Sequence, residues 1–225
     1  MKKKFFKGNL KRYSLKVGKY LREVSVVIIG VAITLLATDL VNKKQEKDNV
    51  DRHLALIYSE LEYNLNNVKD ICKFFEDYHT LKNLLASWVI DPAKVSNDSI
   101  ARYSYVVSSN FTFLYKQAAY TMFVNSGTMK NMKQTNLTLG LTECYLALEV
   151  LKTECDVYNH LHDQEWTKLY SIIDKNTDSD DELFILHPSY NALFNFHRLN
   201  HAVISVANNT KETIERIMAE KKSKR

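Results

Sequence analysis

Residues 24–38 have the sequence VSVVIIGVAITLLAT, which contains no charged side chain. Continued to Val41 the stretch has 18 residues, and an α-helix of that length is about 27 Å long. This nearly matches a bilayer core of about 30 Å, so we expect a transmembrane helix over residues 24–41. A cleaved signal peptide and a buried core helix are the alternatives. Both fit less well, because no small-residue cleavage pattern follows and a core helix would show a polar stripe.

Positive charge is concentrated before this stretch. The chain has 31 Lys or Arg against 26 Asp or Glu, but residues 1–23 hold nine of the basic residues and one Glu, so the remainder has a net charge of −3. No basic face is indicated on the folded part, and we expect no nucleic-acid partner. Only four basic residues follow the span within residues 42–52. The positive-inside rule therefore places the N-terminus in the cytoplasm, with the reverse topology as the alternative.

These features predict a single-pass membrane protein. We expect residues 1–23 to form a basic cytoplasmic tail, residues 24–41 to cross the membrane, and residues 42–225 to form a helical domain outside the cytoplasm.

The composition of the chain favours helices throughout. Five Gly and two Pro are too few for the turns of a strand-rich fold. Apolar residues recur after the span at a mean spacing of 3.5, at Leu54, Ile57, Leu61, Leu65, Val68, Cys72 and Phe75. A second seam alternates steps of four and three, at Leu137, Leu141, Cys144, Leu148, Leu151, Cys155 and Tyr158. We expect an all-α fold in which the span continues into a long stalk helix and an antiparallel bundle of about four to five helices.

Breaks in the pattern divide this region into further helices, which we expect at residues 99–124, 136–173 and 190–221. Asp91-Pro92 and Ser126-Gly127 supply two of the breaks, because a residue before proline avoids helical geometry and glycine commonly ends helices. An acidic loop over residues 174–182 precedes the last helix. It begins like a calcium-binding loop but lacks the glycine and glutamate that such a loop needs at its sixth and twelfth positions. We interpret it as a solvated loop.

Two features suggest self-association. Gly30 and Thr34 form a small-xxx-small pair that could bring two span helices together, although both residues could equally face lipid. The 3.5 spacing over residues 54–75 is typical of a left-handed helix pair. Its partner is either a second copy of the chain or, alternatively, the seam at residues 137–158. We expect a membrane-span contact at Gly30 and Thr34, and a homo-oligomer.

The three cysteines do not form an obvious reactive site. Cys144 and Cys155 lie eleven residues apart on one helix face, about 16 Å, which is too far for a disulfide between them. Cys72 could reach either of them in an oxidising compartment. The odd count and the apolar positions favour buried small side chains instead.

Histidines suggest a metal site only weakly. His197 and His201 share a helix face but lack the acidic partner of a metalloprotease motif, and His160, His162 and Asp163 cluster elsewhere. A glycine-rich phosphate loop, a nucleophile elbow and a paired-carboxylate motif are also missing from the sequence. We therefore expect no catalytic, cofactor-binding or metal-ligating residue and no bound cofactor.

Two blocks of the sequence resemble a known group of proteins. The first comprises Tyr20-Leu-Arg-Glu23, Gly30-Val-Ala-Ile33 and Glu60-Leu-Glu-Tyr-Asn64, and the second comprises Ala118-Ala-Tyr-Thr-Met-Phe-Val-Asn-Ser-Gly127 with Met129, Met132, Leu137 and Tyr145. Together they resemble a family of uncharacterised single-pass membrane proteins common in Bacteroidota. The Thr38-Asp39 exit from the span departs from the amide-rich exit usual in that family. The resemblance implies an anchor in the bacterial inner membrane with a helical domain outside, in the periplasm, and it implies no activity or ligand.

Asp98-Ser99-Ile100 resembles the Asp-Ser/Thr-aliphatic acceptor of O-linked glycans in Bacteroidota. Ser99 is therefore a candidate modification site. The alternative is that Asp98 or Ser99 caps the helix that begins here.

Without site chemistry, recognition is the simplest function that these features support. We expect a non-enzymatic, membrane-anchored interaction or scaffold protein whose helical domain binds a protein partner of unknown identity. One alternative is a helical domain that senses a small ligand. The other is a membrane-perturbing effector that oligomerises through its transmembrane helix.

Overall fold

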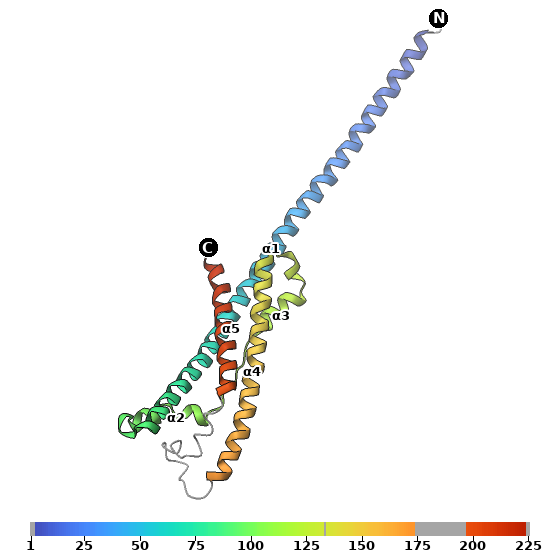
Figure 1. Cartoon of the computed structure of the whole chain (residues 1–225). Helices are drawn as coiled ribbons and strands as arrows, with labels where there is room; N and C mark the ends of the chain where they lie inside the picture. The colour runs from blue at the N-terminus through green and yellow to red at the C-terminus, as the bar shows by residue number, and fades with distance from the viewer. Residues whose placement is uncertain (1–2, 133, 174–196, 224–225) are drawn as a thin grey trace. The chain divides into compact units, whose positions relative to one another are not determined.

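The computed structural model describes residues 3–132, 134–173 and 197–223. They form the five α-helices α1 (Lys3–Ile90), α2 (Asn97–Ser108), α3 (Ala118–Asn125), α4 (Thr135–Ile173) and α5 (His197–Ser223), and the short 3-10 turns η1 (Pro92–Lys94) and η2 (Thr128–Asn131) (Figure 1). No β-strand occurs within these residues. The predicted all-α fold is confirmed.

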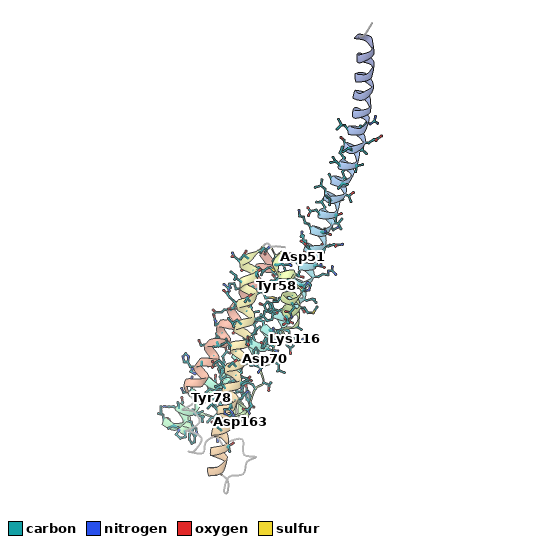
Figure 2. The ribbon with its side chains drawn as sticks, turned by 90° about the vertical axis from the view of Figure 1, so that its right-hand side faces the viewer. Asp51, Tyr58, Asp70, Tyr78, Lys116 and Asp163 are labelled. Atoms are coloured by element: carbon teal, nitrogen blue, oxygen red, sulfur yellow. The ribbon has the colours of Figure 1, made fainter. Side chains whose placement is uncertain are left out.

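The chain divides into two compact units, Met1–Arg52 and His53–Arg225. The first unit is the N-terminal part of α1 and contains the predicted span. Its most apolar window of 18 residues has a mean hydropathy of 2.4, and none of this window is buried within the structure. Figure 2 shows its side chains projecting outward around the helix. Among the described residues, α1 is the one helix long and apolar enough to cross a membrane.

Polar side chains within the span bond back to the helix itself. The hydroxyls of Ser25, Thr34 and Thr38 each donate to the carbonyl oxygen four residues earlier, over 2.8 to 2.9 Å. Such bonds satisfy polar groups that have no water partner in hydrocarbon. They make the segment compatible with a bilayer despite its three hydroxyls.

The core of the second unit is built from the two predicted seams. All seven residues of the seam at 137–158 are buried, and they form one cluster with the α1 residues Ile57, Leu61, Val68, Cys72 and Phe75, against which Leu54 and Leu65 pack. The stripe over residues 54–75 is therefore covered by its own chain. This is the alternative in which the stripe packs on the seam at 137–158. The homo-oligomer and the Gly30 and Thr34 contact stay predictions.

The prediction of one helix over residues 99–124 is wrong. The structure has α2, then an extended segment at residues 109–117, then the short helix α3. We call residues 109–117 the return segment. It runs antiparallel to α1, since Asn64 bonds Lys116 whereas Asn67, further along α1, bonds Leu114. This connection decides the topology of the bundle.

Because the return segment carries the chain back along α1, α4 then runs parallel to α1. Glu60 lies opposite Tyr145, and Phe75 lies opposite Tyr158. Helix α5 is antiparallel to α4, as Figure 1 shows, with Arg216 opposite Glu143. The predicted antiparallel arrangement therefore holds for α5, whereas α1 and α4 are parallel.

Helix ends follow the local chemistry of the sequence. The Asp91 carboxylate accepts a hydrogen bond from the Ala93 amide at the end of α1. Gly127 has a φ of 70° just after α3, a left-handed conformation that favours glycine. A second, smaller core lies between the end of α1 and α2, formed by Leu81, Leu85, Ile100, Val106 and Val107.

Candidate functional site

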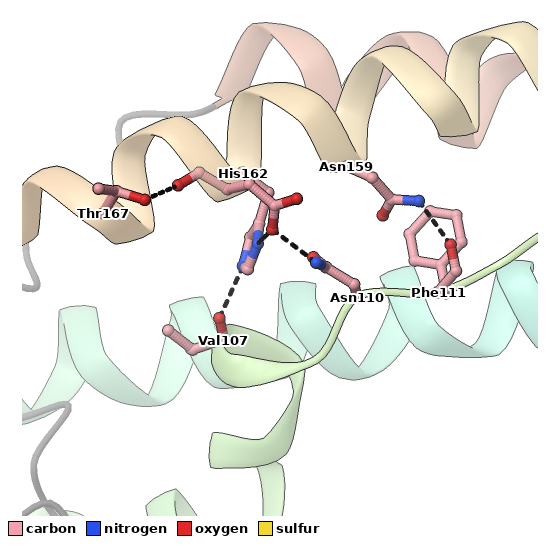
Figure 3. Close-up of polar contacts among 7 residues, drawn as sticks. Val107, Asn110, Phe111, Asn159, His162 and Thr167 are labelled. Atoms are coloured by element: carbon pink, nitrogen blue, oxygen red, sulfur yellow. Dashed lines mark hydrogen bonds and ion pairs between the residues drawn. The ribbon is translucent and has the colours of Figure 1, made fainter. Parts of the chain in front are cut away.

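Side-chain amides hold the return segment between α1 and α4. Asn64, fully buried on α1, donates to the Lys116 carbonyl and accepts from the Lys116 amide, each over 2.8 Å. Asn67 donates to the Leu114 carbonyl over 2.8 Å. On the α4 side, Asn159 donates to the Phe111 carbonyl over 2.6 Å (Figure 3). These side chains satisfy backbone groups that, in an extended segment, would otherwise pair with a neighbouring β-strand.

Aromatic rings give the return segment its inward face. Phe113 is buried, and Phe111 and Tyr115 are half-buried, so every second residue points toward the core. Phe111 stacks on Tyr158 with the ring centroids 5.2 Å apart and meets Phe75 edge-on at 5.5 Å. A period of two is that of an extended chain, which explains why no helix forms here.

The predicted cluster of His160, His162 and Asp163 lies where α4 meets the start of the return segment. His162 Nε2 lies 2.7 Å from the Val107 carbonyl oxygen, and Asn110 donates to the Asp163 carboxylate over 2.6 Å (Figure 3). His160 Nε2 lies 2.9 Å from the side-chain nitrogen of Gln164. His201 is exposed on α5, and His197 lies outside the residues whose side chains the structure describes. No group of three metal-ligating side chains occurs among the described residues.

A buried carboxylate fixes α3. Glu60 accepts hydrogen bonds from the Ala119 amide at 2.9 Å, the Tyr120 amide at 3.4 Å and the Tyr145 hydroxyl at 2.5 Å. Gln117, which precedes α3, makes no capping bond of its own. Glu60 therefore caps α3 from another helix, where the amide ends of the helix dipole favour negative charge. Burial and the Glu60 carboxylate raise the pKa of Tyr145, so its hydroxyl stays protonated and able to donate.

The cysteines are three free thiols, and all are buried. Burial raises the pKa values of Cys144 and Cys155 to about 12, and burial also raises that of Cys72. Protonated thiols are poor nucleophiles and poor metal ligands. The prediction of buried small side chains is confirmed, and the proposed bridge from Cys72 is not formed.

The most distinctive surface feature is an apolar row on α4. Leu139, Leu146, Val150 and Val157, which we call the outer row, are 56, 59, 42 and 42% exposed. Their spacing of seven, four and seven residues places them on one side of the helix. This side faces away from the buried seam at 137–158. Helix α4 therefore has exposed aliphatic side chains on its outer face, with Thr142, Glu143 and Thr153 between them, in addition to its buried seam. A helix that only covers a core has a polar outer face.

A groove between α4 and α5 adjoins the outer row. It has a volume of about 610 Å³, and Leu146, Val150 and Val206 contribute apolar surface to its lining. Arg216 of α5 donates to Glu143 of α4 over 2.9 Å at its polar edge. The two helices approach closely beside it, because α4 has a glycine, Gly140, where it meets Ile217.

Sequence patterning alone did not single out the outer row. Its residues follow steps of seven, four and seven, and they alternate along α4 with the more closely spaced residues of the core seam. The signal that could have found it is the presence of two such rows on one helix. One of the two had to be exposed, since the bundle covers only one face.

The remaining predicted sites have the following positions. Gly30 lies on the exposed surface of α1, and a side chain added there would meet nothing within 4 Å. Thr34 bonds the Gly30 carbonyl. Ser99 is half-buried in the first turn of α2, whose cap position is Ser96 rather than Asp98 or Ser99. The acidic loop at residues 174–182 lies outside the described residues.

Comparison with known proteins does not assign this site. No protein-family model, curated protein sequence or solved structure matches the chain.

Proposed function

We propose that this protein is a membrane-anchored interaction protein without catalytic activity, and that it binds a protein partner through the outer row and the adjoining groove. The outer row carries the proposal. Four aliphatic side chains lie on one face of α4, all more than two-fifths exposed, and clusters of exposed apolar side chains mark binding sites on soluble domains.

The anchor is residues 24–41, and the proposed topology has the N-terminus in the cytoplasm of a bacterial cell and the helical domain in the periplasm. The excess of nine basic residues before the span over four after it supports this orientation. The resemblance to single-pass proteins of Bacteroidota supports the same arrangement. A reporter fused after Arg225 would be active only outside the cytoplasm, and activity confined to the cytoplasm would refute the topology.

Site-specific photo-crosslinking tests the binding surface. A photoreactive residue in place of Leu146 should crosslink to a protein partner in living cells, and mass spectrometry of the product should identify the same partner in repeated experiments. The matched control replaces Leu56, which is 55% exposed on α1 outside the groove. Val150→Asp should abolish the crosslink at position 146. Equal crosslinking from positions 56 and 146 would argue against a binding surface on α4.

A ligand-sensing domain is the second candidate, and the groove favours it. A volume of about 610 Å³ is within the range of small-molecule sites. Native mass spectrometry of the purified full chain would detect a retained ligand. Loss of that ligand in Val206→Asp, with unchanged crosslinking from position 146, would favour sensing over recognition.

A further inference from the structure

We propose that the partner bound by the outer row is a basic amphipathic helix, with Lys or Arg flanking its apolar stripe. This inference rests on the proposed function and names the chemistry of the partner. It follows from the shape of the row, the charges beside it and the poor fit of the alternatives.

The shape of the outer row fits a helix. Leu139 and Val157 are 18 residues apart, so the row is about 27 Å long on a straight helix. A partner helix of about five turns would match this length. The four side chains lie on one side of α4 at steps of seven, four and seven residues, and a row of this kind can pack against a facing helix.

The charges beside the row are mainly negative. Between residues 135 and 164, α4 carries the acidic residues Glu143, Glu149, Glu154, Asp156 and Asp163, and Lys152 is its one Lys or Arg. Lys152 is paired with Asp156 at 2.5 Å. Across the groove, Arg216 is paired with Glu143. Glu143 and Asp156 are thus balanced by basic partners, and Asp163 accepts a hydrogen bond from Asn110 of the return segment. Glu149 and Glu154 give the border of the outer row its negative charge, which complements a helix whose flanks are basic.

A second copy of the chain fits this surface poorly. In a parallel α4 pair in register, Glu143 would face Glu143 of the other copy within the seam. In an antiparallel pair with Leu146 opposite Val150, the two copies of Glu149 would come together. Like charges at these positions destabilise helix pairs. Anionic lipid is excluded by the same sign of charge, since it attracts basic rather than acidic surfaces.

The test uses the full chain in nanodiscs of phosphatidylcholine and two fluorescent peptides of about 21 residues, which is three heptads. Both peptides carry Leu at every a and d position. One has Lys at e and g, and the other has Glu. Fluorescence anisotropy measures binding, and empty nanodiscs correct for binding to lipid. We expect the Lys peptide to bind about ten-fold or more tightly than the Glu peptide, and this preference to shrink at high salt.

Three variants test where the Lys peptide binds. Leu146→Asp should weaken it about ten-fold or more, the loss expected from one buried leucine. Leu56→Asp should leave its affinity unchanged. Glu149→Lys should weaken the Lys peptide and strengthen the Glu peptide. Unchanged far-ultraviolet circular dichroism of each variant would show that the fold is retained.

Each other outcome overturns the inference in a recognisable way. Equal affinity for both peptides, or preference for the Glu peptide, would refute the basic partner and leave the interaction surface standing. If neither peptide binds but crosslinks at position 146 persist, the basic partner would also be refuted and the interaction surface would stand. Failure of both peptides without such crosslinks would refute the proposed function as well. A dimer that Leu146→Asp dissociates would show that the occupant is a second copy.

Discussion

Removing the Glu60 carboxylate is the sharpest test of how the helical domain is held together. In Glu60→Ala, α3 loses the acceptor for its first amides, and the Tyr145 hydroxyl loses its partner at a buried position. A missing cap costs about 1 kcal/mol. A hydrogen bond to a charged group contributes about 1.5 to 3 kcal/mol. Together we expect a loss of about 3 kcal/mol in the free energy of unfolding.

Thermal unfolding followed by circular dichroism measures this loss on the full chain in detergent. For a domain of this size, 1 kcal/mol shifts the Tm by about 2 to 4 °C, so Glu60→Ala should lower the Tm by about 6 to 12 °C. Tyr145→Phe should lower it less, because the carboxylate keeps both backbone amides of α3. The control is Glu62→Ala, an exposed glutamate on the same helix, which should leave the Tm nearly unchanged.

The reasoning would be refuted in two ways. A Tm of Glu60→Ala within about 2 °C of the wild-type value would show that the network contributes less than about 1 kcal/mol. A larger loss in Tyr145→Phe than in Glu60→Ala would show that the hydroxyl, rather than the tertiary cap, is the stabilising element. Hydrogen exchange at the amides of Ala119 and Tyr120 would then identify which bonds remain.

Three further predictions concern the thiols, the helix contact and the span. In the folded chain, iodoacetamide at about pH 8 should label none of the cysteines, since burial keeps them protonated, and three labels should appear in urea. The thiols of Cys144 and Cys155 stay protonated to a higher pH in the folded state than in the unfolded state. Their contribution to the free energy of unfolding is therefore complete below about pH 9 and should be lost as the pH rises toward about 12. Gly140→Leu should cost about 1 to 3 kcal/mol by overpacking, because a Cβ there would lie 2.4 Å from Ile217 Cδ1, and unchanged stability would contradict this close contact. Ile29→Arg should impair membrane insertion, given about 2.5 to 3.5 kcal/mol for a charge at the centre of a span, and unchanged fractionation with membranes would count against the anchor.

Much of this fold could be predicted because helical periodicity is a local property. The spacing at residues 54–75 and 137–158 identifies the faces of α1 and α4 that are buried, and the structure buries them. Ser126-Gly127 and Asp91-Pro92 mark helix ends because of the covalent structure of glycine and proline. Glycine has no Cβ atom and can adopt a left-handed conformation, whereas the ring of proline fixes φ. The apolar span needs no tertiary partner to be recognised, since its length and hydropathy alone match a bilayer.

The candidate site could not be predicted in the same way, because it depends on residues far apart in the chain. The sequence predicts residues 109–117 within one helix over residues 99–124, whereas the structure has them extended. Asn64 and Asn159 instead supply hydrogen bonds to the extended backbone. Likewise, the sequence of α4 shows two apolar rows, and only the packing of α1 and α5 decides that the seam is covered and the outer row is exposed. The sequence by itself determined the long helices and which of them is long and apolar enough to cross a membrane, since both follow from the order of side chains along one helix. Tertiary structure decided the parallel course of α1 and α4, the capping of α3 by Glu60 and the surface left for a partner, since each depends on which distant segments come to lie together.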